Sequence, residues 1–165
     1  MRPIAFILAL FLTSGPAAAQ GWMEYTYPDH SFSVHFPSEP KIEATTYQAP
    51  DGGSFEARTY SVTQDSGVFR MTVVELPDSG IDETALISHA VKTMTQGAQI
   101  KLDIPHRIRQ VYGRQLSIAG ADGSLSHVAV FYHKKRLYQI EGKALVGGGT
   151  AEVDAMIFHQ SLDLT

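Results

Sequence analysis

The sequence contains no cysteine in its 165 residues. Disulfides, thiolate metal ligands and a cysteine nucleophile are therefore excluded. It also lacks a long apolar run, because residues 4–12 form a stretch of nine where a membrane-spanning helix needs about 20. Positive charge is in the minority, with 13 Lys and Arg against 17 Asp and Glu. This balance disfavours nucleic acid or an anionic membrane as the main partner.

Motifs of known enzyme classes are missing as well. There is no G-x-S-x-G nucleophile elbow and no H-E-x-x-H zinc motif. The glycine run at residues 147–149 lacks the G-K-[ST] of a phosphate-binding loop, so we interpret it as a flexible connection. The sequence therefore predicts no catalytic residue, no metal ligand and no cofactor.

The first residues have the pattern of a secretory signal peptide. Arg2 precedes the apolar run, Gly15 and Pro16 break it, and three alanines form an A-x-A cleavage site ending at Ala19. We predict a signal peptide over residues 1–19 and export to the periplasm or the cell exterior. The remaining residues 20–165 suit a single domain, and loss of Arg2 leaves it a net charge of −5.

A predicted β-hairpin is the centre of the chain. Residues 125–132 and 137–140 are short runs rich in β-branched and aromatic side chains, and the polar residues 133–136 separate them. In the first run Val128 and Val130 point to one side, whereas Ala129 and Phe131 point to the other. Both faces are apolar, which is typical of a central strand covered on both sides.

Other segments complete an α+β pattern. Alternation predicts strands over residues 32–36, 42–49, 54–63, 68–76, 100–104 and 108–118, with a break at Pro105. One helix should begin with Ser79 or Asp82 as its cap, bury Leu86, Ala90 and Met94, and end at Gly97. A final helix should begin at Thr150 and bury Val153, Met156 and Ile157. We therefore predict an antiparallel sheet covered by about two main helices. We expect five residues to be largely buried: Phe36, Met94, Val130, Tyr138 and Ile157.

Residues 27–37, with the sequence YPDHSFSVHFP, resemble the N-terminal motif of secreted domains with the PsbP-like fold. That motif is an aromatic, an acidic turn, an F-x-[VI]-x-[FY]-P strand and a proline-rich exit. Residues 136–140 and 158–162 resemble the last hairpin and helix of small bacterial members. The resemblance implies an α/β/α sandwich. It also implies an accessory role, because most members are non-catalytic partners of something larger.

Three sets of residues are candidate sites. Lys134, Lys135 and Arg136 form a basic hairpin tip, which is either a solvated turn or a docking point for an acidic partner. Tyr112, Tyr132 and Tyr138 are candidates for a ligand groove between sheet and helix. Among seven histidines, His127 and His133 share a strand face, but about 20 Å separates them, too far to share a metal.

The leading hypothesis is an exported, non-catalytic binding domain that engages a protein or peptide partner. The alternative is a carrier of a small apolar ligand held between sheet and helix. A histidine-dependent hydrolase or metal-binding protein is the third class. The sequence names no particular partner and no oligomeric state.

Overall fold

The computed structural model describes residues 21–77, 79–145 and 150–165. The predicted signal peptide and the glycine run at 147–149 lie outside these residues. Within the described chain, no helix has the length and apolar character to cross a membrane.

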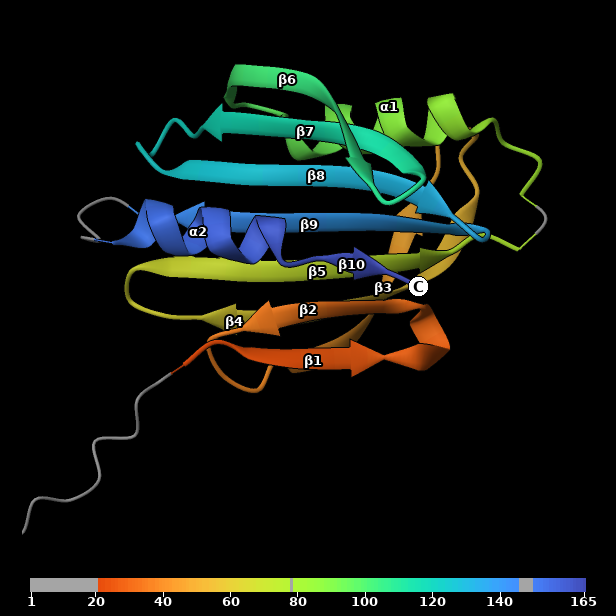
Figure 1. Cartoon of the computed structure of the whole chain (residues 1–165). Helices are drawn as coiled ribbons and strands as arrows, with labels where there is room; N and C mark the ends of the chain where they lie inside the picture. Colours follow the sequence, from red (N-terminus) through yellow and green to blue (C-terminus); the bar gives the residue numbers. More distant parts are fainter. Residues whose placement is uncertain (1–20, 78, 146–149) are drawn as a thin grey trace, which may run out of the picture.

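A seven-stranded antiparallel sheet forms the centre of the domain (Figure 1). Its strand order is β3-β4-β5-β9-β8-β7-β6, so the two strands of the predicted hairpin lie inside the sheet. The strand bounds are β3 (Lys41–Gln48), β4 (Ser54–Thr63), β5 (Gly67–Glu75), β6 (Gln99–Ile108), β7 (Val111–Ala119), β8 (Leu125–His133) and β9 (Arg136–Ala144).

Different elements cover the two faces of this sheet. Helix α1 (Glu83–Met94) packs on one face. Helix α2 (Ala151–Gln160) and a three-stranded sheet pack on the other, as Figure 1 shows. The small sheet has the order β1-β2-β10, with β1 (Met23–Tyr27), β2 (Phe32–Phe36) and β10 (Asp163–Leu164), and the 3-10 helix η1 (Pro28–His30) joins β1 to β2. The α+β prediction is confirmed, although α2 shares its face with β1, β2 and β10.

Both the turn conformation and the burial of its two faces favour the central hairpin. Lys134 and Lys135 make the two-residue turn, and both have positive φ, 48° and 61°. A turn with two such residues has the twist that antiparallel strands require. The alternation of β8 is as predicted, because Val128 and Val130 lie in the core under α1 and Ala129 and Phe131 lie in the core under α2.

Helix α1 also follows its sequence signals. The Asp82 side chain accepts a hydrogen bond from the Ala85 amide at 3.1 Å, which satisfies one of the free N–H groups at the helix start. Gly97 has a φ of 76°, the left-handed conformation that often follows a helix end. Leu86 and Ala90 are buried, whereas Met94 is only half-buried.

Helix α2 buries a different face from the one the sequence predicts. Val153, Met156 and Ile157 are exposed by 52%, 40% and 40%. The buried side is formed by small and aromatic residues, namely Ala151, Ala155, Phe158 and His159. The physical reason lies in β9, where Gly142 lets the helix backbone approach the sheet directly. Thr150 directly precedes this helix, as predicted, but its hydroxyl donates to Asp154 at 3.4 Å and makes no capping bond to the backbone.

The strand β6 continues through Pro105, where the sequence predicts a break. Proline has no N–H group, so it is tolerated only where a strand does not need that donor. β6 is the edge of the sheet and pairs only with β7, which explains the difference.

Of the five residues expected to be buried, Phe36, Val130 and Tyr138 are fully so.

Candidate functional site

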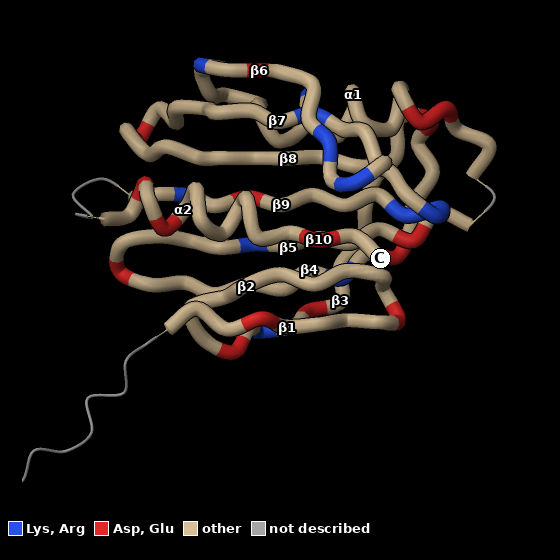
Figure 2. Tube along the Cα trace, viewed as in Figure 1, with Lys and Arg blue, Asp and Glu red and all other residues tan. Residues whose placement is uncertain are grey.

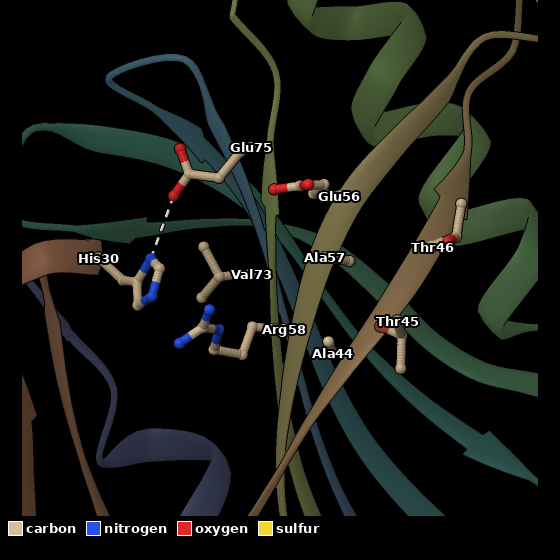
Figure 3. A pocket seen from close by; sticks show the side chains of 9 residues that line it. All are labelled: His30, Ala44, Thr45, Thr46, Glu56, Ala57, Arg58, Val73 and Glu75. Carbon is tan, nitrogen blue, oxygen red and sulfur yellow. Dashed lines mark hydrogen bonds and ion pairs between the residues drawn. The ribbon is translucent and has the colours of Figure 1, made fainter.

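A polar pocket of about 420 Å³ lies beside η1, on the sheet face that carries α2 (Figure 3). Three neighbouring strands, β3, β4 and β5, form its floor, and His30 from η1 stands at its side. The charged residues that line it are Glu56, Arg58 and Glu75.

The two-residue period of the strands brings these side chains to one face. On β4, Glu56 and Arg58 alternate in step with Tyr60, which is 1% exposed in the core. The rings of Tyr27 and Phe32 cover Tyr60, with centroids 4.3 and 5.3 Å from its own. Two residues before Tyr60, Arg58 is already exposed. The pocket therefore lies where the cover provided by the small sheet ends.

Glu75 is held by two partners. One of its carboxylate oxygens accepts a hydrogen bond from Arg136 Nε at 2.7 Å and lies 3.1 Å from His30 Nδ1. Arg136 also donates to the Ser31 hydroxyl at 3.3 Å, and the Tyr138 hydroxyl donates to the His30 carbonyl at 2.9 Å. Burial alone would lower the pKa of Arg136, but the hydrogen bond and charge of Glu75 outweigh it and raise that pKa. This network fixes η1 against β5 and β9.

Arg58 stands apart from this network. Among the described residues, its guanidinium has no hydrogen-bond or ion-pair partner, and the same holds for the Glu56 carboxylate. Figure 3 shows the Arg58 side chain extending across the floor in front of Val73, toward the side of the pocket where His30 stands. The pocket thus offers one cation with its hydrogen-bond donors unused, and one anion two residues away on the same strand face.

The predicted basic tip adjoins the pocket. Lys134 donates to the Thr165 backbone oxygen at 2.7 Å. The Lys135 backbone oxygen accepts from the Leu76 amide at 2.9 Å, which ties the turn to the end of β5, directly after Glu75. Figure 2 shows the basic β8–β9 turn with acidic residues next to it. Lys134 and Lys135 are exposed at the turn, whereas the Arg136 side chain is 22% exposed and reaches back to Glu75.

The three tyrosines of the predicted groove are not brought together. Tyr112 and Tyr132 line a shallow hollow of about 390 Å³ on the α1 side of the sheet, and Tyr112 is 65% exposed. Tyr138 is fully buried in the core on the opposite face. A single groove lined by all three residues therefore does not form.

The sequence did not reveal the residues of the pocket. His30 and Glu75 are 45 positions apart, and Arg58 is one of many charged residues in alternating strands. One sequence pattern could have indicated two of them. Glu56 and Arg58 occupy alternate positions with Tyr60, so these charged residues share the apolar face of their strand. Within the described residues, no group of three or more His, Asp or Glu could hold a metal ion.

Comparison with known proteins identifies the fold. No family model and no curated protein matches the sequence. Among solved structures, the chain is similar to cyanobacterial PsbP (CyanoP) from Synechocystis, with a TM-score of 0.57 and 11% identity over 92% of this chain and 96% of that one. A protein of unknown function from Pseudomonas aeruginosa matches with a TM-score of 0.44 and 7% identity, over 82% of this chain and 90% of that one. The order of strands and helices and the match to CyanoP show that the chain has the PsbP-like fold.

Proposed function

We propose that this protein is a non-catalytic accessory domain that binds an extended segment of a protein partner in the pocket beside η1. The observation that carries the proposal is the free guanidinium of Arg58, in a pocket whose other basic side chain, His30, is already engaged by Glu75, as is the neighbouring Arg136. A fold shared with CyanoP is compatible with an accessory role, but it says nothing of a partner.

The chemistry of the pocket favours a particular ligand. A guanidinium forms its strongest hydrogen bonds with a carboxylate, often through two parallel N–H groups. Glu56 lies two residues along the same strand face and would repel a second carboxylate but attract an ammonium. Side chains two residues apart in an extended peptide point the same way, about 6.6 Å apart. The pocket therefore suits an extended segment that carries an acidic and a basic side chain at positions i and i+2.

The hairpin tip extends the same surface. We propose that Lys134 and Lys135 guide an acidic partner toward the pocket. Exposed charges at the rim of an interface mainly affect the rate of association, and salt screens their effect beyond about 8–10 Å. The alternative of an apolar ligand carrier has less support, because buried side chains of two core clusters pack between the sheet and both helices.

The first test is peptide binding to the purified domain. The probe is a capped peptide, Thr-Glu-Thr-Lys-Thr, and its match is Thr-Gln-Thr-Lys-Thr, with affinity measured by NMR titration at low salt. We expect the Glu peptide to bind about tenfold more tightly, because a hydrogen bond to a charged group contributes about 1.5–3 kcal/mol. The variant Arg58→Gln should remove this preference.

Two control variants test whether the preference for the Glu peptide comes from the pocket or from the overall charge of the domain. Arg70→Gln makes the same change on the opposite face of the sheet, where Arg70 pairs with Glu141 at 3.4 Å, and it should keep the preference. Replacing Lys134 and Lys135 by Ser should change the unfolding free energy by no more than about 0.5 kcal/mol. This double substitution should slow association of the peptide with the domain at low salt, but not at high salt. Equal affinity of the wild-type domain for both peptides would overturn the proposal.

A further inference from the structure

Three of the seven histidines meet between α2 and the sheet, far apart in sequence. His106 comes from β6, His127 from β8 and His159 from α2. The ring centroid of His159 lies 6.0 Å from that of His106 and 6.3 Å from that of His127. This cluster is separate from the pocket beside η1 and plays no part in the function proposed above.

The buried environment of this cluster favours neutral imidazole rings. His159 is 3% exposed, and neither of its ring nitrogens makes a hydrogen bond of good geometry among the described residues. The Nε2 atom of His127 is also buried without a hydrogen-bond partner among the described residues, while its Nδ1 lies 3.1 Å from the Ser117 hydroxyl on β7. A proton on His159 would therefore place a poorly compensated charge in the core, beside two other groups that can become positive.

The surroundings offer little compensation for such a charge. The nearest carboxylate is Glu152, whose Oε1 lies 4.0 Å from His127 Nε2, and its side chain is 64% exposed. Other contacts with α2 are uncharged, because Phe36 from β2 and Phe69 from β5 pack on Phe158 and Gly142 from β9 meets the helix backbone. Among the described residues, the cluster therefore has Glu152 as its one weak anionic neighbour, and that carboxylate faces His127, not His159.

We propose that His159, with His106 and His127 packed against it, forms a proton-sensitive latch, which keeps α2 docked on the sheet while the His159 ring is neutral and releases it when that ring is protonated. Release would expose the apolar side of α2, where Phe158 packs against Phe36 and Phe69. The trigger is acidification, and the moving element is the helix that Gly142 allows to lie against β9.

The direction of the effect follows from the pKa values. Burial, together with the nearby His106 and His127, lowers the pKa of His159 to about 4, and the Val128 backbone opposes this shift only in part. Burial lowers the pKa of His106 as well. The released state has the ordinary value of about 6.5, so it binds more protons between pH 6.5 and 4. The released-to-docked ratio should be lowest above pH 6.5 and rise as the pH falls to 4, by about tenfold per pH unit from His159, with His106 acting in the same direction.

The protein carries its own reporter for the test. Trp22 is the single tryptophan, and its ring lies 6.4 Å from that of Phe158 and 5.1 Å from that of Phe69. We expect its fluorescence to shift to longer wavelength between pH 6.5 and 4, while far-UV circular dichroism shows that the strands persist. In His159→Leu this transition should disappear or move below pH 4. His89→Gln, on α1 and outside the cluster, should behave like wild type.

Each outcome decides the proposal. A wild-type protein without a fluorescence change above pH 4 would overturn it, as would a His159→Leu variant with an unchanged transition. If His159→Leu does not fold, His106→Gln at the half-buried edge position takes its place. A transition moved to lower pH in that variant supports the latch, and an unmoved transition refutes it.

Discussion

Replacing Val130 by Asp should lower the free energy of unfolding by about 4–5 kcal/mol, the upper end of what single substitutions do. Val130 is fully buried in the central strand β8, in the core under α1 with Leu116 and Leu137. The aspartate would be a buried charge whose cross-strand neighbour, Arg114, is already bound to Asp103, and its protonation or exposure would cost most of the stability of a small domain. Urea unfolding followed by circular dichroism measures the change.

The control for this variant is the same substitution at an exposed valine. Val153 is 52% exposed on α2, so Val153→Asp should change the unfolding free energy by no more than about 0.5 kcal/mol. The prediction for Val130 fails if the two variants unfold at the same urea concentration. That result would also contradict the central position of β8 in the sheet.

Adding a single methyl group at Gly142 should cost about 2–3 kcal/mol of stability, as overpacking of a filled core does. A Cβ atom there would overlap the backbone oxygen of Ala155 and lie 2.8 Å from the Ala155 Cα, atoms that cannot move aside like the end of a side chain. The helix α2 would have to shift outward and lose contact with Phe69 and Phe36. Thermal unfolding of Gly142→Ala measures the cost.

Gly52 provides the comparison. Its φ is 85°, and a Cβ atom added at this residue would have no other atom within 4 Å, so Gly52→Ala tests backbone strain without a clash. It should cost about 1 kcal/mol, the strain of an alanine in the left-handed region. A Gly142→Ala variant no less stable than Gly52→Ala would show that the close approach of α2 to β9 is not needed.

The sequence predicts those parts of the fold that depend on local pattern. The central hairpin follows from alternation in residues 125–132, and α1 follows from four-residue spacing with a cap at Asp82. The face of α2 could not be predicted from size and apolarity, because the closest contact is between Gly142 and the backbone at Ala155. Small residues at a close approach look the same in sequence as small residues in a loop.

The candidate site depends on contacts that sequence does not reveal. Whether Arg58 is covered or free is decided by where β1 and β2 end, and η1 brings His30 to Glu75 across 45 positions. The hairpin tip was visible as a basic run, but the role of Arg136 within it was not. Its side chain reaches back to Glu75, so it belongs to the network that holds this pocket residue and differs from the two exposed lysines.

The most direct test of the binding proposal is a charge exchange at Arg58. Arg58→Glu should lose the preference for Thr-Glu-Thr-Lys-Thr and instead bind Thr-Lys-Thr-Lys-Thr more tightly than wild type does, because the pocket would then carry two unpaired carboxylates. The affinities of both proteins for both peptides are measured by NMR titration at low salt. An exchange of preference is the predicted result, and the same ranking of the two peptides by both proteins would contradict the proposal.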